Sequence, residues 1–318
     1  MVNKISFSGN IIDKHSLMLN GCSGVQFTTF DRHGQFSSKL MRISLIIFLL
    51  ISILSGPANS QVDLPLAESQ LRSLADSIAR GSTEEIRSKS FNDFKLLLDE
   101  VIATEGSFSY PFDSVPSLSK HTAPDGRFRI YTWLMPSMEM NKYLYSGIIQ
   151  FSEPLPDGKN HVTLTDVSEL YQNNEMRSFV NGQWYGAVYY DLFAKKVKGQ
   201  LRYYLLGWRG NDQFTTSKVI DVISFDDKGS LVMGSQDFIG PGDKVRHRVI
   251  FTFAAQAVML LRHEKRKKRI VFDHLSPAVD KAEGDFRYYG PDFTYDAFRF
   301  KRGSWYYKEH LEPRNRGN

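Results

Sequence analysis

The amino-acid sequence predicts a mainly β protein: an antiparallel, strongly twisted sandwich or incomplete barrel with an N-terminal helical hairpin. From residue 108 onward, roughly a dozen short apolar runs are separated by turn-forming residues. No segment of helix length lies among them, which favours hairpins, because parallel strands need long crossover connections. The run from Leu201 to Trp208 is largely apolar on both faces of a strand, which predicts a central strand covered on each side.

The first 60 residues are predicted to lie outside this fold. Residues 1–40 show no sustained helical or strand period, and we interpret them as an over-extended, disordered leader. Residues 41–60 have the three parts of a secretory signal peptide: a basic start, the apolar run Ile43–Leu54 and small residues before a cleavage site at Gln61. The apolar run is too short for a membrane span, which needs about 20 residues. A cytoplasmic tail ahead of a signal anchor is the alternative interpretation.

Cysteine content and net charge exclude several classes of function. Cys22 is the only cysteine and lies in the leader, so the segment from residue 61 can form no disulfide and has no cysteine nucleophile. Five of the 40 basic and two of the 35 acidic residues precede residue 61, which leaves 35 and 33, a net charge of +2. We therefore expect an exported protein, periplasmic or extracellular, with no transmembrane span after signal cleavage and no specific nucleic-acid partner.

Residues 61–106 are predicted to form the helical hairpin, packed on the β body. The segment Leu64–Arg80 is apolar at helical spacing, and Gly81 is placed to end the helix. A second helix is predicted to begin with Ser82 as its N-cap and to end at Gly106. Covering one face of a sheet is the simplest role for this pair, and a partner-binding or lid element is the alternative.

The β body, residues 107–318, is divided by turn signals of glycine, asparagine, aspartate and proline. Each signal separates two apolar runs, as expected for hairpins and meanders. The signals are Pro124-Asp125-Gly126, Pro156-Asp157-Gly158, Asn181-Gly182, Asp226-Asp227-Lys228-Gly229 and Lys301-Arg302-Gly303.

No motif names an enzyme class. The sequence has no G-x-S-x-G elbow, no Walker phosphate loop and no G-x-G-x-x-G, and His263-Glu264 lacks the second histidine of a zinc-protease motif. We therefore expect no cofactor and assign no metal site, and an enzyme that uses none of these motifs stays an alternative.

Four residues in the last third of the chain are weak catalytic candidates. Asp273 and His274 follow an apolar strand, where a carboxylate and an imidazole can act as an acid/base pair or bind a metal. Consecutive strand residues point to opposite faces, so the alternative is a turn aspartate beside a packed histidine. Asp292 and Asp296 can belong to a glycosidase-like carboxylate pair or to a calcium site, and a solvated loop is the alternative.

The end of the central strand holds the candidate ligand-binding residues. Trp208 can stack on a sugar ring, while Asn211 and Asp212 can bond to its hydroxyl groups. The alternative is a core tryptophan followed by ordinary turn residues. The basic run Arg262–Arg269 is interpreted as a charged hairpin tip, and its alternative is contact with anionic envelope lipid, polysaccharide or nucleic acid.

Several segments together resemble a family of uncharacterised exported Gram-negative bacterial proteins. The resemblance rests on Pro124–Trp133, Tyr203–Asp212, Arg248–Phe251, Arg269–Pro277, Tyr295–Phe298 and Trp305. It implies export and a single unit over residues 61–318. The family has no assigned activity, so the resemblance implies no role for any residue.

The sequence therefore predicts a non-catalytic binding or envelope-associated protein whose ligand is a glycan, a peptide or an anionic envelope component. The alternative is a hydrolase of an envelope or extracellular polymer, with carboxylates drawn from Asp212, Asp273, Asp292 and Asp296. A pocket that brings two of these carboxylates together favours hydrolysis. An exposed aromatic surface without such a pair favours binding.

Overall fold

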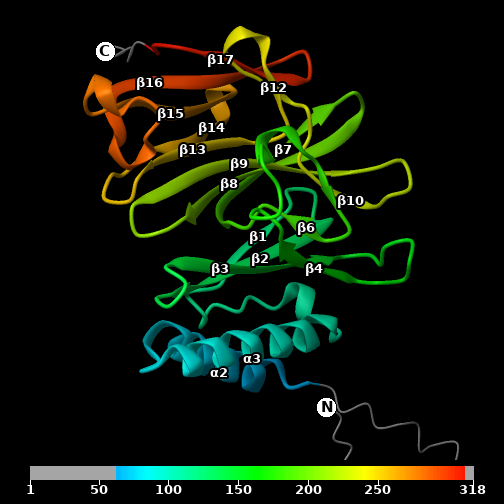
Figure 1. Ribbon diagram of the computed structural model, residues 1–318. Helices are drawn as coiled ribbons and strands as arrows, with labels where there is room; N and C mark the ends of the chain where they lie inside the picture. Colours follow the sequence, from blue (N-terminus) through cyan, green and yellow to red (C-terminus); the bar gives the residue numbers. More distant parts are fainter. Residues whose placement is uncertain (1–61, 312–318) are drawn as a thin grey trace, which may run out of the picture. The chain divides into compact units, whose positions relative to one another are not determined.

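The computed structural model describes residues 62–311, which form a pair of helices and three β-sheets stacked in layers (Figure 1). All the described residues belong to one compact unit. The predicted leader, residues 1–40, and the predicted signal peptide, residues 41–60, lie outside the described residues, so both stay predictions. None of the helices within residues 62–311 is long and apolar enough to cross a membrane.

The predicted helical hairpin is present as α2 (Leu64–Arg80) and α3 (Glu84–Ala103). Gly81 directly follows α2, as expected. The N-cap of α3 is Thr83, whose hydroxyl accepts a hydrogen bond from the backbone N–H of Ile86 at 3.2 Å. The prediction of Ser82 as the cap is therefore wrong by one residue. Two neighbouring hydroxyl residues compete for this role, and the backbone geometry selects the second.

Sheet one lies directly on the helices. Its strands, in spatial order, are β1 (Ser119–Thr122), β2 (Phe128–Ser137), β3 (Lys142–Phe151), β4 (His161–Asp166) and β6 (Gln183–Trp184). Phe94 and Leu98 of α3 and Trp133 of β2 are buried in the core between these two layers. The Phe94 and Trp133 rings lie 5.2 Å apart between centroids. The helices thus cover one face of a sheet, as the simpler prediction states.

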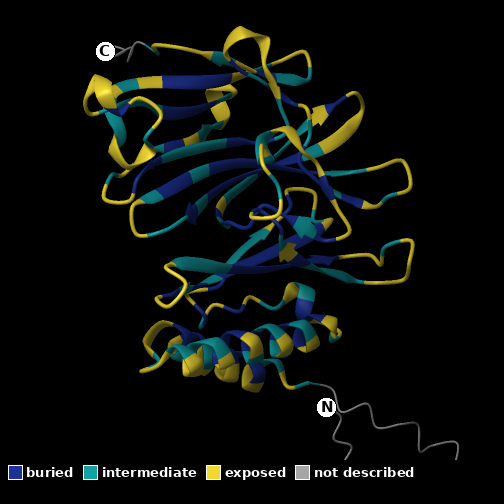
Figure 2. Ribbon diagram, viewed as in Figure 1, coloured by how far each residue is buried: buried dark blue, intermediate teal, exposed yellow. Residues whose placement is uncertain are grey.

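Sheet two is the middle β layer, and apolar side chains pack against both of its faces. Its strands are β5 (Phe179–Val180), β10 (Leu231–Met233), β9 (Thr215–Phe225), β8 (Gln200–Gly210) and β7 (Val188–Val197), with β13 (Val249–Ala254) also paired to β9. Tyr203 and Leu205 of β8 pack toward sheet one, while Tyr204 and Leu206 pack toward sheet three. The predicted central strand is confirmed, and Figure 2 shows its layer as predominantly buried.

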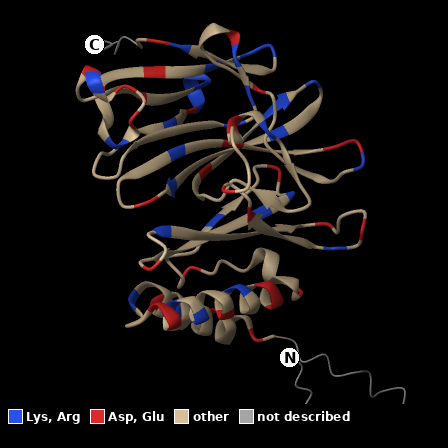
Figure 3. Ribbon diagram, viewed as in Figure 1, with Lys and Arg blue, Asp and Glu red and all other residues tan. Residues whose placement is uncertain are grey.

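Sheet three covers the far face of sheet two. Its strands are β12 (Val245–Arg246), β11 (Phe238–Ile239), β17 (Ser304–Lys308), β16 (Tyr289–Lys301), β15 (Arg269–Pro277) and β14 (Leu261–Glu264). The predicted basic hairpin tip is the turn between the edge strand β14 and its neighbour β15. Glu264 forms ion pairs with three of its basic side chains, those of Arg262, Lys267 and Arg269. In Figure 3, acidic and basic residues are interspersed over the strands and loops.

The sheets are open and predominantly antiparallel, which confirms the predicted sandwich. Two short pairs, β4 with β6 and β11 with β17, are parallel. The Asn181-Gly182 turn has left-handed φ values of 55° and 77°. This turn takes the chain from β5 in sheet two to β6 in sheet one, so it links two layers instead of closing a hairpin within one sheet.

Candidate functional site

A small pocket opens where β8 ends and β9 begins. Its volume is about 180 Å³, and its walls include Tyr143, Trp208, Asp212, Thr215 and Lys218. The loop between β13 and β14 supplies the opposite wall with Ala255, Ala257, Val258 and Met259. Two of the predicted ligand-binding residues, Trp208 and Asp212, therefore line one cavity.

Two aromatic rings meet at this pocket because a glycine lies beside them. Tyr143 of β3 packs edge to face against Trp208, with ring centroids 5.5 Å apart. A Cβ atom on Gly210 would lie 2.3 Å from the Tyr143 ring and 2.8 Å from the Trp208 ring. Any larger residue at position 210 would force the rings apart, since real Cβ contacts are longer than 3 Å. The Tyr145 hydroxyl donates to the Gly210 carbonyl at 3.0 Å and so holds the strand end.

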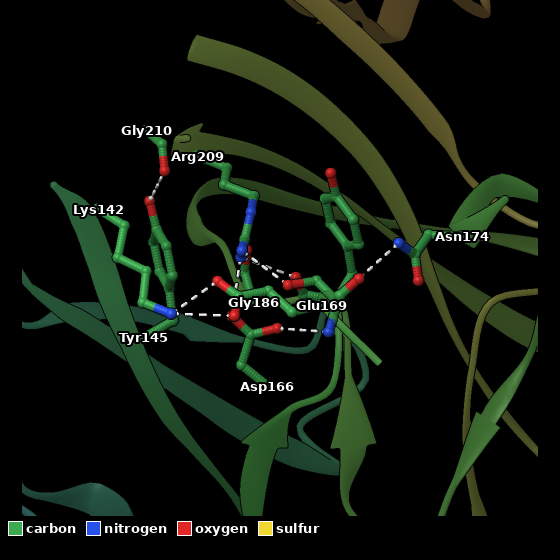
Figure 4. A network of polar contacts seen from close by, with 10 residues as sticks. Lys142, Tyr145, Asp166, Glu169, Asn174, Gly186, Arg209 and Gly210 are labelled. Carbon is green, nitrogen blue, oxygen red and sulfur yellow. Dashed lines mark hydrogen bonds and ion pairs between the residues drawn. The ribbon is translucent and has the colours of Figure 1, made fainter. Parts of the chain in front are cut away.

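Behind the pocket wall, Arg209 is buried in a polar network (Figure 4). Its Nη1 donates to Oδ2 of Asp166 at 2.9 Å and to the carbonyls of Tyr185 and Gly186 at 2.9 and 2.6 Å. Its Nη2 donates to the Ser168 hydroxyl at 2.7 Å. Burial alone would lower the pKa of Arg209, but Asp166, Tyr185 and Tyr145 together more than offset this and hold that pKa above its ordinary value.

A second buried arginine stabilises the same connection between the sheets. Arg248 and Asp221 are both fully buried, and Nε of Arg248 donates to Oδ1 of Asp221 at 3.2 Å. Nη1 of Arg248 also donates to the carbonyl of Arg177 at 2.9 Å. The Arg209 and Arg248 guanidinium groups lie 5.0 and 5.9 Å from the ring centre of Tyr185. The two arginines together hold the long segment that links β4 to β7, so their role is structural.

Asn211 and Asp212 act partly as turn residues. The amide of Asn211 donates to the Ser217 hydroxyl at 3.0 Å, and Asn211 is not among the pocket-lining residues. Oδ1 of Asp212 accepts from the backbone N–H groups of Phe214 and Thr215, both at 2.8 Å. The structure therefore places Asn211 inside the hairpin and Asp212 at both the turn and the pocket wall.

None of the catalytic candidates on sheet three has a side chain that lines this pocket. These candidates are Asp273, His274, Asp292 and Asp296. Oδ2 of Asp273 accepts from the backbone N–H of Leu260 at 2.7 Å, so this carboxylate anchors the loop that forms the pocket's opposite wall. The strand pairing shifts by a β-bulge between Asp273 and Leu275, which places His274 at an irregular position. Asp273 and His274 therefore have different partners, in keeping with the alternative interpretation.

His274 instead pairs with Asp296. Nδ1 of His274 lies 2.7 Å from Oδ2 of Asp296, which also accepts from the Tyr307 hydroxyl at 2.6 Å. Asp296 is buried, and its hydrogen bond raises the pKa of the half-buried His274. Oδ1 of Asp292 caps a turn by accepting from the Thr294 N–H and hydroxyl. The hydrogen bond to Asp296 orients the imidazole of His274. No cluster of three metal-ligating side chains is found within residues 62–311.

A larger cleft lies at the opposite end of β9. Its volume is about 640 Å³, and the turns at residues 155–159, 181–182 and 228–231 line it. Lys159 forms an exposed ion pair with Asp157 at 3.2 Å, while His161 lies 3.2 Å from Asp99. None of the sequence candidates lies in this cleft.

Tyr143 and Lys218 are among the pocket residues that the sequence did not predict. Tyr143 comes from a different sheet, and no local pattern relates it to Trp208. Lys218 is the register partner of Trp208 across β8 and β9. Its signal in the sequence is a lysine within the apolar strand SKVIDVISF.

Comparison with known proteins finds no matching family model, no matching curated protein and no matching solved structure. The resemblance to an exported family therefore stays a prediction.

Proposed function

We propose that this chain is a non-catalytic binding protein that holds one ring of a glycan in the Trp208 pocket. The support is the combination of a half-buried indole, the Asp212 carboxylate and the hydroxyl residues Thr215 and Thr216 around one cavity. An aromatic face packs on the apolar side of a sugar, and polar groups fix its hydroxyls. The volume of about 180 Å³ is below the range of roughly 300–1,000 Å³ for drug-sized ligands, which suits a single ring.

One observation favours binding over the hydrolase alternative. Asp212 is the only carboxylate among the described residues that line the pocket. Glycoside hydrolysis by the common mechanisms uses two carboxyl groups on either side of the scissile bond. The other candidates have local partners, since Asp273 accepts from Leu260 and Asp296 is buried between His274 and Tyr307. The pocket therefore offers recognition chemistry without the second carboxylate.

The proposal includes export to the periplasm or the exterior, which rests on the signal-peptide pattern in residues 41–60. N-terminal sequencing of the exported protein checks this part, and a mature chain that begins at Gln61 is the expected result. A chain that keeps residues 1–40 would contradict it.

Intrinsic fluorescence can report the pocket directly. The chain has four tryptophans, and Trp133, Trp184 and Trp305 are at most 2% exposed, which leaves Trp208 as the accessible one. We expect iodide to quench Trp208 preferentially, and a bound glycan to protect it. Titrations with mono- and oligosaccharides, short peptides and anionic lipid vesicles separate the three ligand classes.

Trp208→Ala is expected to weaken glycan binding by about tenfold or more, which corresponds to roughly 1.4 kcal/mol. Val180→Ala is the matched control, because Val180 is exposed and lies outside the pocket. Calorimetry measures both affinities. Unchanged affinity in Trp208→Ala, or protection of Trp208 by peptides or vesicles but by no saccharide, would contradict the proposal.

A further inference from the structure

Lys218 lies near the start of β9 and lines the wall of the Trp208 pocket. Its register partner is Trp208, and the same cavity is bordered by the apolar side chains of Phe253 and Met259. Its Nζ lies 4.4 Å from the ring centre of Tyr190, which places the amine above an aromatic ring. Within residues 62–311, Lys218 forms no ion pair, in contrast to Lys142, which pairs with Glu169 at 2.9 Å.

This environment disfavours the charged ammonium. Burial lowers the pKa of Lys218, so a larger share of the side chain is the neutral amine at a given pH. A neutral lysine amine is a nucleophile, and lysines that form imines in proteins are commonly activated by an apolar pocket. Asp212 is the only charged group that shares the pocket lining with Lys218 among the described residues, and no ion pair joins the two.

We propose that Lys218 condenses reversibly with an aldehyde group of a ligand in this pocket. The amine lone pair attacks the carbonyl carbon, the C–N bond forms, and the carbonyl oxygen becomes the hydroxyl of a carbinolamine. Loss of this hydroxyl with a proton from nitrogen releases water and leaves an imine, so no oxidant or reductant takes part. The ligand class is an aldehyde, which includes the open-chain form of a reducing sugar. The inference uses the pocket of the proposed function but does not depend on glycan affinity.

Lys195 provides an internal comparison. Burial and the nearby Lys268 and Lys265 also lower the pKa of Lys195, but its side chain is not part of the pocket. If desolvation alone made a lysine reactive, Lys195 and Lys218 would react alike. A difference between them isolates the contribution of the cavity.

The experiment traps the imine on the intact protein. Glycolaldehyde is small enough for the pocket, and sodium cyanoborohydride reduces any imine to a stable amine. Peptide mass mapping at about pH 7.5, well below the ordinary lysine pKa of roughly 10.4, gives the labelling rate of each lysine. We expect Lys218 to be labelled at least about ten times faster than Lys195 and the exposed Lys196, a ratio that corresponds to roughly 1.4 kcal/mol in activation free energy.

Lys218→Arg should remove the fast-labelled site, while Lys195→Arg should leave it. A rate ratio under about ten between Lys218 and Lys195 in the unmodified chain overturns the inference, and this measurement needs no variant. Its failure is distinct from that of the proposed function. Slow labelling of Lys218 together with saccharide protection of Trp208 would reject the imine but support the proposed binding function. Fast labelling of Lys218 without saccharide binding would support the imine but reject the proposed binding function.

Discussion

Trp208 and Arg209 are consecutive residues of β8 whose side chains leave opposite faces of sheet two. The Trp208 indole borders the pocket, and the Arg209 guanidinium is buried against Asp166 at 2.9 Å. The wall of the candidate site therefore shares its backbone with a buried ion pair. Changes on the sheet-one side should be detectable at the pocket.

Arg209→Met is expected to destabilise the fold by about 3–5 kcal/mol, because it leaves the Asp166 carboxylate and two carbonyls without their partner. Urea unfolding followed by circular dichroism measures this loss. Iodide quenching of the folded variant should also increase at Trp208. Arg262→Met is the control, since the Arg262 side chain is 59% exposed and its ion pair adds little. A loss under about 1 kcal/mol for Arg209→Met would contradict the structural role.

Gly186→Ala tests the close packing beside Arg209. Gly186 has a φ of +72°, and a Cβ there would lie 2.3 Å from Oδ2 of Asp166 and 2.5 Å from Nη1 of Arg209. Gly126 has a similar φ of +74° with no atom within 4 Å, so Gly126→Ala shows the cost of the left-handed backbone alone, about 1–2 kcal/mol. We expect Gly186→Ala to cost about 1–3 kcal/mol more in chemical denaturation. Equal losses of stability in Gly186→Ala and Gly126→Ala would mean that Asp166 and Arg209 shift to accommodate the added methyl group without cost.

Thr83→Ala and Ser82→Ala separate the two possible caps of α3. The Thr83 hydroxyl accepts the Ile86 N–H, so its removal should cost about 1 kcal/mol, while Ser82→Ala should be nearly neutral. Thermal unfolding of both variants gives the comparison. A larger loss for Ser82→Ala would restore the cap that the sequence predicts.

His274→Gln should change the pH dependence of stability. Asp296 raises the pKa of His274 by hydrogen bonding, so the charged pair stabilises the fold at low pH, and this contribution is lost as pH rises through the folded-state pKa. The loss of stability in His274→Gln should therefore be larger at about pH 5.5 than at about pH 8.5. Melting temperatures across this range measure it.

His121→Gln is the control with the opposite trend. Burial lowers the pKa of His121, so the neutral form stabilises the fold and its contribution falls as the solution becomes acidic. Parallel pH trends in the His274 and His121 variants would contradict the assignment of their environments.

The architecture was predictable from local periodicity. Leu201–Trp208 is apolar on both strand faces, and this pattern is enough to indicate a layer on each side. Helical spacing likewise placed the helix that ends before Gly81. The layer change at Asn181-Gly182 was not predictable, because an Asn-Gly pair signals a tight turn without stating which sheet receives the next strand.

The candidate site was only partly predictable. The position of Trp208 and Asp212 at the end of an apolar strand was sufficient to select them, but Tyr143 joins them through tertiary packing. Buried arginines are also hard to anticipate, since arginine is usually exposed. Asp221 within an apolar strand and Arg248 at the start of another were the available signals, and each predicts a buried partner without identifying it.

Because sheet two is enclosed on both sides, the chain cannot be divided into autonomous halves. A fragment that stops after β10 would leave Tyr204 and Leu206 of β8 uncovered, together with their apolar neighbours on β9. Such a fragment would expose a broad hydrophobic surface and would self-associate instead of remaining monomeric. Any truncation meant to isolate the pocket must therefore retain β15 and β16.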